Sequence, residues 1–439
     1  MQTVREKFDD IAEDLTYNVT KIYGRKDIII TADLVFHSVL GFKFMGEYVQ
    51  KGWTEACIIG DTRSGKSKTL EELVAHYKAG EIIIGEDLSY AGLIGGLQQI
   101  NKRWFITWGK LVLLNRRLAV IDEVNNLDVK DIASMSGIRS RGIAEITKIQ
   151  QSRAEARTRQ IWLGNPRSNR FLDTYAHGIV ALKELIGKLD DIARFDLGIA
   201  CAETEVPETT YNNPHHKSVP HRYTSELCHN LIMWAWSRKR DQVKFIEGAE
   251  DAILERSSDL SKKYTSQIPL VNRSEMRIKL ARLSVAAAAR VFSTDETFEV
   301  VVVTPEHVEF VHDFLVECYD KPTMSYDIYT KIKEGELKLE HEKEVFDYVV
   351  KKGKDFMDGF LNYEYLALGD IQDFTEEDRD GSKKIISHLV KQKCLKKYHT
   401  QYIKTPAFNG LLRRMKLDHN KGTLKFDGPA KHLEFDAFE

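Results

Sequence analysis

The residues with the clearest chemical signature run from Gly60 to Ser67 and fit the spacing G-x-x-x-x-G-K-[ST] of a phosphate-binding loop. The apolar run 55–59 predicts a buried parallel strand before this loop, and the run 68–77 predicts a helix after it. In that setting backbone N–H groups close around phosphate oxygens, Lys66 contacts the β- and γ-phosphates, and the Ser67 hydroxyl holds Mg²⁺. The nucleotide-binding candidates are Gly60, Asp61, Thr62, Arg63, Ser64, Gly65, Lys66 and Ser67. A chance Gly-rich turn is the alternative, and it explains neither the spacing nor the flanking elements.

A pair of acidic residues follows a second apolar run, 118–121, and could complete such a site. A nucleotide hydrolase needs one carboxylate for its metal and another group to polarise water. Asp122 is expected to hold Mg²⁺ and Glu123 to act on the attacking water. Without a phosphate loop upstream, the commoner interpretation would be that the pair caps the next helix.

Two further strands end or begin at polar residues. The run 159–164 precedes Asn165, which could reach the γ-phosphate or orient water, because ligands of open α/β sheets bind where strands end. Arg194 stands just before the last apolar run and suits an arginine finger that neutralises transition-state charge. A surface ion pair with Asp190 or Asp191 is the alternative for Arg194.

Composition restricts the class of protein. The chain has 439 residues with 42% hydrophobic and 30% charged residues, as expected for a soluble globular protein of two or three domains. Its formal net charge is −2, so nucleic acid would have to bind at local basic patches. No apolar run has the ~18–20 residues of a membrane span. Five scattered cysteines without a C-x-x-C pair argue against zinc and for buried thiols in a reducing cytosol; we expect a cytoplasmic, nucleoid-associated protein with no membrane partner.

These elements, in this order, resemble the AAA+ ATPases and, within them, the minichromosome maintenance (MCM) helicases. Six segments carry the resemblance. They are 23–28, similar to I-Y-G-x-E-D-I; 91–113, similar to the helix-2 insertion and its strand-like return; 156–158 with 164–166, similar to N-A-R-T…A-N-P; 193–197, similar to S-R-F-D-L; 282–284, similar to the lid helix R-L-S; and 303–308, similar to V-T-x-x-D-V. The resemblance covers about residues 20–315.

Departures from the family pattern are also visible. Too few residues precede Gly60 for the family's oligonucleotide-binding domain with its zinc module, and Arg63-Ser64 replaces a Thr-Ala pair. We therefore expect a divergent, stripped-down relative, such as a virus or mobile element could encode, and double-hexamer formation is in doubt.

The resemblance implies a ring-shaped homo-hexamer around single-stranded or forked DNA, with ATP and Mg²⁺ between neighbours. Lys66, Asp122, Glu123 and Asn165 would act within one subunit, and Arg194 would enter from the next. The lid also contributes an arginine in trans in this family; its aligned position falls near Glu275, so Arg277 or Arg273 is the candidate, with a solvated helix face as the alternative.

Two loops are implied to contact DNA. One is the tip of the helix-2 insertion, with Lys102 and Arg103. The other is a hairpin within residues 139–159, where Lys148 aligns with the family's DNA-contacting lysine. This segment contains six basic residues and two acidic ones. Basic hairpins grip phosphates without reading sequence. Trp104 could stack on a base, although burial under the insertion is expected, and the basic window could instead be a charged helix face between subunits.

The predicted fold is α/β: an AAA+ P-loop ATPase core with a parallel sheet and an N-terminal helical leader (1–205), an all-α lid (206–330) and a C-terminal winged-helix domain (341–439). Linkers are expected at 206–220 and 321–340. Lysines around residues 383–397 make the third domain basic, which suits either a DNA or partner surface or a solvated helix.

Three functions compete. The first is an ATP-driven DNA helicase or translocase of replication. The second is an AAA+ loader or remodeller of replication complexes that does not unwind, which could work with a separate DNA-binding, primase or polymerase partner. The third, a nucleotide switch without hydrolysis, is disfavoured by Glu123 and Arg194.

Overall fold

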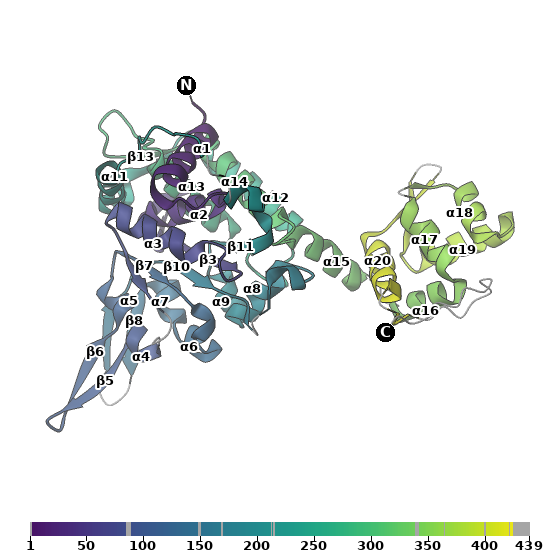
Figure 1. The fold of residues 1–439 in the computed structure, drawn as a ribbon, viewed down its shortest axis with the longest axis horizontal. Helices are drawn as coiled ribbons and strands as arrows, with labels where there is room; N and C mark the ends of the chain where they lie inside the picture. The colour runs from purple at the N-terminus through teal and green to yellow at the C-terminus, as the bar shows by residue number, and fades with distance from the viewer. Residues whose placement is uncertain are drawn as a thin grey trace. The chain divides into compact units, whose positions relative to one another are not determined.

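A computed structural model describes most of the chain. The described residues are 2–84, 89–147, 151–167, 170–211, 213, 216–338, 342–363, 365–398, 401–420 and 422–424. They divide into two compact units, 1–326 and 327–439 (Figure 1). Within the described ranges, every helix is too short or too polar to cross a lipid bilayer.

A five-stranded parallel sheet forms the centre of the first unit, in the order β11-β3-β10-β7-β4. The bounds are β3 (Glu55–Gly60), β4 (Glu81–Ile83), β7 (Leu118–Ile121), β10 (Arg159–Gly164) and β11 (Leu197–Cys201). All of these except β4 are buried along their whole length, which is why their sequences are continuous rather than alternating in hydrophobicity. The predicted α/β core with a parallel sheet is confirmed, and the carboxyl ends of β3, β10 and β7 lie side by side.

The leader and the helix after the phosphate loop pack on this sheet. The leader consists of α1 (Val4–Asp14), the π-helical η1 (Leu15–Thr20) and α2 (Lys26–Phe36). After the loop comes α3 (Lys66–Tyr77). Asp33 of α2 accepts a hydrogen bond from Tyr77 at 2.7 Å and pairs with Arg290 of the lid at 2.7 Å, and all three side chains are buried. This network joins the leader, the loop helix and the lid into one unit.

Two antiparallel hairpins leave the core. The first joins β5 (Gly95–Ile100) to β6 (Arg103–Trp108) between α4 (Tyr90–Leu93) and α5 (Lys110–Leu113), and it extends away from the sheet in Figure 1. The segment after β6 is therefore helical, and the strand-like return predicted there is wrong. The second hairpin joins β8 (Ile143–Thr147) to β9 (Gln151–Glu155) and follows α6 (Val129–Ser134) and α7 (Ser136–Arg141).

Helices α8 (Gly178–Ile186) and α9 (Leu189–Ala193) lead into β11, and α10 (Glu208–Tyr211) follows it. The lid helices are α11 (Ser225–Ser237), α12 (Ala249–Lys263), α13 (Met276–Arg290) and α14 (Pro305–Asp320). The lid also holds a short parallel pair, β12 (Val243–Phe245) with β13 (Val301–Val303), which the sequence did not indicate. Near α12 lies a small hairpin of the leader, β1 (Phe42–Phe44) with β2 (Glu47–Val49), because the backbone N–H of Met45 donates to Glu250 at 2.7 Å.

Residues 326–338, within the second predicted linker, form α15 (Tyr326–Lys338) instead. The second unit then runs α16 (Glu342–Lys352), α17 (Lys354–Asn362), β14 (Tyr365–Leu366), α18 (Leu368–Thr375), α19 (Arg379–Lys391), β15 (Leu395–Tyr398), β16 (Gln401–Lys404) and α20 (Pro406–Asn420). Its strands form an antiparallel sheet in the order β14-β16-β15 over a core that includes Phe356, Phe360 and Leu389. The winged-helix assignment of this unit stays a prediction.

Candidate nucleotide-binding site

The loop from Gly60 to Gly65 is shaped by close backbone approaches at both ends. A Cβ at Gly60 would lie 2.6 Å from the carbonyl oxygen of Cys201 on the neighbouring strand. Gly65 has φ +89°, and a Cβ there would lie 2.6 Å from Cγ2 of Ile22. Arg63 between them also has a positive φ, 66°. Such a tightly curved backbone suits a cradle of N–H groups at the start of α3.

Lys66 is folded into this loop rather than extended into solvent. Its Nζ donates to the carbonyl oxygens of Gly60 (2.9 Å) and Asp61 (2.8 Å), to Ser64 Oγ (3.1 Å) and to Asn165 Oδ1 (3.1 Å). Burial lowers the pKa of Lys66 to about 8, because an ammonium loses hydration there, although nearby Asp122 opposes the shift. Lys66 therefore links the phosphate loop on β3 to Asn165 at the end of β10.

Asp122 and Glu123 lie at the end of the next strand, β7. One oxygen of Asp122 accepts the backbone N–H of Glu123 at 2.8 Å. Glu123 has a left-handed backbone, φ 56° and ψ 40°, a conformation uncommon for a glutamate and often found at functional sites. Glu123 stands at the N-cap position of the short 3-10 helix Val124–Asn126 but makes no side-chain capping bond, and the next helix, α6, is capped by Asp128, so a capping role does not account for the acidic pair.

Three strand ends thus meet around one cavity of about 410 Å³. Its lining residues are Ile22, Thr62, Arg63, Ser64, Gly65, Lys66, Ser67, Lys68, Asp122, Glu123, Asn125, Gly164 and Asn165. Cationic, hydroxyl, carboxylate and amide groups therefore face the same space, which is the donor set that a magnesium-bound triphosphate requires.

Asp61 has a different place from its neighbours in the loop. Its carboxylate is buried, accepts the backbone N–H of Leu172 at 2.7 Å and that of Glu203 at 3.0 Å, and does not line the cavity. Gly60 also contributes backbone beneath the cavity rather than at its wall. Asp61 thus fastens the loop to two segments more than 100 residues away in sequence.

Residues that sequence reasoning missed support the far wall. Arg167 donates to the carbonyl oxygens of Asn125 (2.8 Å), Leu127 (2.8 Å) and Leu185 (3.0 Å). Asn125 in turn accepts the backbone N–H of Asn165 at 3.1 Å. These bonds hold the segment after Glu123 against the end of β10. Only the position of Arg167, two residues after Asn165, could have pointed to it.

The two candidate trans-acting arginines lie elsewhere. Arg194 donates to the carbonyl oxygen of Asp190 (2.8 Å) and to Asp191 Oδ1 (2.9 Å), which is the ion pair weighed as its alternative. Arg277 is exposed in the first turn of α13, and Arg273 is exposed just before it. None of these arginines lines the cavity of its own chain.

The insertion hairpin presents its predicted tip to solvent. Asn101 and Lys102 form the turn, with positive φ angles of 50° and 61°, and Arg103 begins β6. Trp104 is 37% exposed and Phe105 47% exposed, so the expected burial of Trp104 is wrong. The side chain remains available for stacking because the hairpin stands away from the core.

The second hairpin is confirmed as a hairpin, and Lys148 lies outside the described residues. Its basic neighbours are mostly engaged: Arg153 pairs with Glu145 at 2.5 Å and Arg157 with Glu155 at 2.6 Å, while Arg139 and Arg159 are buried. The charged-helix alternative is wrong for residues 143–147 and 151–155, because these are strands.

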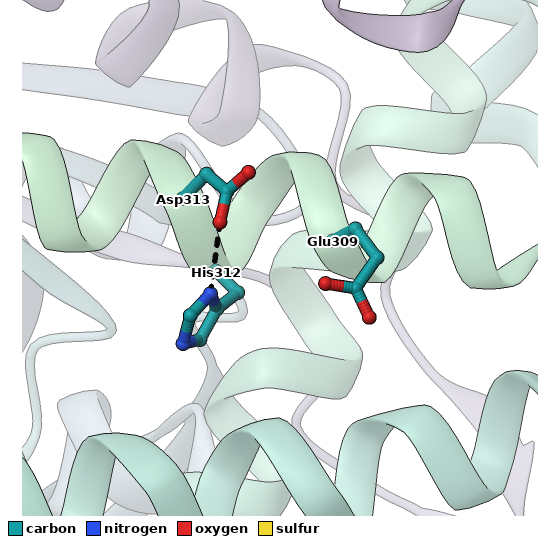
Figure 2. Close-up of side chains that lie close together, drawn as sticks. All are labelled: Glu309, His312 and Asp313. Carbon is teal, nitrogen blue, oxygen red and sulfur yellow. Dashed lines mark hydrogen bonds and ion pairs between the residues drawn. The ribbon is translucent and has the colours of Figure 1, made fainter.

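A group of three potential metal ligands lies on α14. Ligand atoms of Glu309, His312 and Asp313 lie within 4.8 Å of one another (Figure 2). However, both oxygens of Glu309 accept Nε of Arg256, at 2.8 and 2.9 Å, and His312 Nδ1 already contacts Asp313 at 3.0 Å. A guanidinium at the carboxylate opposes a second cation, so we assign no metal to this group. The five cysteines are buried free thiols.

Comparisons with known proteins agree with this geometry. Residues 1–208 match the family model of the MCM P-loop domain. Maternal DNA replication licensing factor mcm6 of Xenopus tropicalis is 24% identical over 330 residues, which cover 70% of this chain and 37% of that protein. DNA replication licensing factor MCM2 of Arabidopsis thaliana is 22% identical over 204 residues, which cover 45% of this chain and 22% of that protein.

The sheet, the phosphate loop and the strand-end residues define the first unit as a P-loop nucleotide-binding protein. The predicted resemblance is confirmed: residues 1–208 match the MCM P-loop domain, and the chain is similar to MCM proteins. It spans well under half the length of the relatives that it matches.

Proposed function

We propose that the chain hydrolyses ATP and moves along single-stranded or forked DNA as one subunit of a ring-shaped homo-hexamer in replication. The observation that carries this proposal is the convergence of Lys66, Asp122, Glu123 and Asn165, from three strand ends, on one cavity in an MCM P-loop domain. The names of the two relatives, both DNA replication licensing factors, support replication as the setting.

Within the pocket, each group has a distinct role. Lys66 releases its carbonyl partners and holds the β- and γ-phosphates. Ser67 and Asp122 would hold Mg²⁺, which would supply positive charge against these phosphates. Glu123 polarises the attacking water and Asn165 orients it near the γ-phosphate. Because Lys66 and Asn165 are already hydrogen bonded, both arrive at the phosphate from one preformed position.

The remaining groups fit work between subunits. Arg194 and Arg277 do not line their own pocket, which is the placement that residues acting on a neighbour's nucleotide require. The tip residues Lys102 and Arg103 are exposed on a protruding hairpin, where basic groups can contact DNA phosphates. We also propose Lys148 as a contact of the second hairpin.

The second candidate is a loader or remodeller that does not unwind. It is favoured by Arg153 and Arg157, because both are paired with glutamates and leave the second hairpin with less basic charge than its sequence suggests. A translocase and a loader would share the pocket and differ at this hairpin.

The experiment that tests the proposal measures ATP turnover and displacement of a labelled strand from a forked DNA by the full chain. We expect ATP-dependent displacement by the unmodified protein, and we expect Lys66→Ala to abolish both activities since the phosphates lose their cation. ATP turnover that survives Lys66→Ala would refute the pocket. Intact turnover without any displacement would favour the loader.

A further inference from the structure

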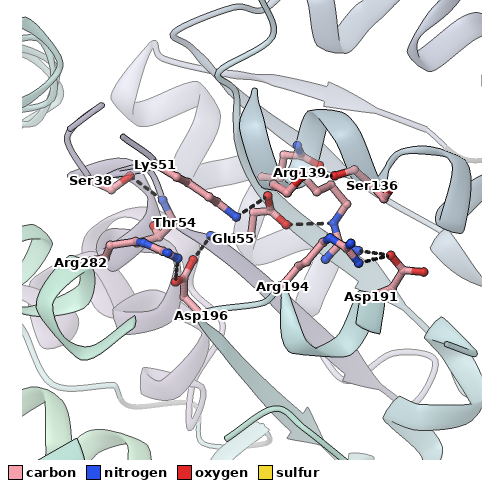
Figure 3. A network of polar contacts seen from close by, with 12 residues as sticks. Ser38, Lys51, Thr54, Glu55, Ser136, Arg139, Asp191, Arg194, Asp196 and Arg282 are labelled. Atoms are coloured by element: carbon pink, nitrogen blue, oxygen red, sulfur yellow. Dashed lines mark hydrogen bonds and ion pairs between the residues drawn. The ribbon is translucent and has the colours of Figure 1, made fainter. Parts of the chain in front are cut away.

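Arg194 belongs to a network of polar contacts that is largely buried (Figure 3). At its centre is Arg139 of α7, which is fully buried, with its guanidinium carbon 4.6 Å from the ring centre of Trp162 and 4.2 Å from that of Phe195. Its Nε donates to Glu55 Oε2, at the start of the phosphate-loop strand, at 2.9 Å. The two rings and this bond hold the inner side of the guanidinium, at Nε.

The outer end of Arg139 is not satisfied. Neither Nη1 nor Nη2 has a hydrogen-bond partner, although both are shielded from solvent. Nη1 stands 3.7 Å from Asp191 Oδ1, the same oxygen that accepts Arg194 Nη1 at 2.9 Å. Two guanidiniums thus share one carboxylate oxygen: Arg194 is hydrogen bonded to it, and Arg139 is held just beyond hydrogen-bond distance.

Asp191 needs a cation whatever Arg194 does. Its side chain is 2% exposed, and burial raises its pKa although Arg139 and Arg194 oppose the shift. A buried carboxylate left without a partner is strongly destabilised. If Arg194 leaves Asp191 to reach a nucleotide, the cost falls on this carboxylate unless another cation replaces it.

We propose that Arg139 is a positioning residue for Arg194 that takes over Asp191 when Arg194 extends toward the neighbouring subunit's nucleotide. This inference rests on the proposed action of Arg194 in trans. A shift of about 1 Å brings Arg139 into hydrogen-bond distance of Asp191. The exchange gives the unsatisfied donors of Arg139 a partner, so it offsets the bond that Arg194 gives up.

The position of Arg139 in the fold links this exchange to the second hairpin. Arg139 lies near the end of α7, and Gly142, at φ +66°, joins α7 to β8. A Cβ on Gly142 would lie 2.6 Å from Cγ of Arg157, so the hairpin base is packed tightly against this junction. The hairpin base is therefore connected through this tight junction to the helix that carries Arg139.

A purely structural role for Arg139 makes a different prediction. Its bond to Glu55 could simply stabilise β3, and then its loss would impair the pocket of the same chain. If Arg139 acts through Arg194, the loss of Arg139 impairs the pocket of the next chain instead. The two roles can be separated by choosing which subunit carries the substitution.

The experiment mixes two inactive full-length chains and measures ATP turnover of the mixture. The Arg194→Ala chain keeps an intact pocket, and the Glu123→Gln chain keeps its Arg194. We therefore expect ATP turnover to return only at interfaces where the Glu123→Gln chain supplies Arg194 to the pocket of the Arg194→Ala chain. Arg139→Gln is then added to one chain at a time. We expect a loss of about tenfold or more when it is on the Glu123→Gln chain, and a change within twofold when it is on the Arg194→Ala chain.

Each outcome has one meaning. No restored turnover in the parent mixture overturns the proposed trans action itself. Restored turnover that Arg139→Gln reduces equally from either chain, or from neither, overturns the positioning role. Because Arg139→Gln could prevent folding, Asp191→Asn is tested in the same two placements. It removes the shared charge at nearly constant volume, and the same asymmetry is expected.

Discussion

The nucleotide pocket and the edge that carries Arg194 are built in opposite ways. In the pocket, Lys66, Asp122, Glu123 and Asn165 face one cavity, and Lys66 is bonded directly to Asn165. At the edge, Arg194 is held by Asp191 and does not line that cavity. One chain therefore carries the residues that line the nucleotide cavity and, apart from them, an arginine that does not reach this cavity. This is the arrangement expected if a neighbouring chain supplies the arginine needed for catalysis.

The two regions also differ in how they are held. Asp61 fastens the phosphate loop with two backbone hydrogen bonds, both within 3.0 Å, so the loop is fixed before any ligand binds. Among the described residues, the hydrogen-bond partners of Arg194 are its sequence neighbours Asp190 and Asp191 of α9, four and three positions before it, and the Arg194 side chain is 25% exposed. The pocket is thus held by contacts remote in sequence, whereas Arg194 is held by local ones, and the cost of its leaving buried Asp191 is offset only if Arg139 takes its place.

The largest expected effect separates binding from turnover. Arg194→Ala should lower kcat by about 10³-fold, the magnitude associated with an arginine finger, because the group acts only on transition-state charge. The Kd of ATP should change little, because the residues that line the pocket are unchanged and Arg194 is proposed to act on the transition state rather than on bound ATP. Steady-state kinetics and equilibrium binding of a labelled ATP analogue measure the two quantities.

Arg222→Ala is the matched control for that variant, because Arg222 is an exposed arginine in a loose, 3.8 Å pair with Asp10. It should leave both quantities unchanged. If Arg194→Ala behaves like this control, Arg194 forms only a surface ion pair and the contrast between pocket and edge is lost.

The pocket could be predicted from sequence because its chemistry follows strands in fixed local patterns. Lys66 and Ser67 come at set distances after β3, and Asp122, Glu123 and Asn165 directly follow β7 and β10. Each strand was recognisable as a buried apolar run. Parallel pairing then brings their ends together, so local patterns were sufficient to find the set.

The supporting contacts could not be predicted, because their partners are remote in sequence. Arg139 contacts Glu55 across 84 positions, and Asp61 contacts Glu203 across 142. An isolated Arg or Asp carries no signal for such a partner. Likewise, the charged composition of residues 326–338 suggested a linker, yet the same residue types favour the helix α15.

A smaller, graded effect should come from pH at the pocket. Because the pKa of Lys66 is about 8, its ammonium is lost above that pH, and binding of a non-hydrolysable ATP analogue should weaken by up to tenfold per pH unit. Titration calorimetry between about pH 6.5 and 9.5 measures this. Lys66→Arg keeps its charge, so its binding should not fall over this range, and equal slopes for both proteins would contradict the assignment.

The free energy of unfolding should depend on pH in the opposite direction to nucleotide binding. Burial lowers the pKa of Lys66 from 10.5 to about 8, so between these values the unfolded chain holds more protons at this position than the folded chain. The contribution of Lys66 to the free energy of unfolding therefore rises with pH in this window, while its grip on phosphate falls. Thermal unfolding without nucleotide distinguishes loss of binding from loss of fold.

The smallest effect concerns DNA and shows whether the pocket works without the second hairpin. Lys148→Ala should leave ATP turnover without DNA nearly intact, because the family resemblance assigns this residue to DNA contact and not to the nucleotide. It should reduce strand displacement and flatten the log–log salt dependence of DNA binding by about one unit, since one phosphate contact is lost.

Arg153→Ala is the control on the same hairpin: Arg153 is already paired with Glu145, so its removal should change the slope less. If the two variants alter the salt dependence equally, the hairpin holds DNA through its general charge and Lys148 has no special role; if neither does, the exposed tip with Lys102 and Arg103 carries the contact.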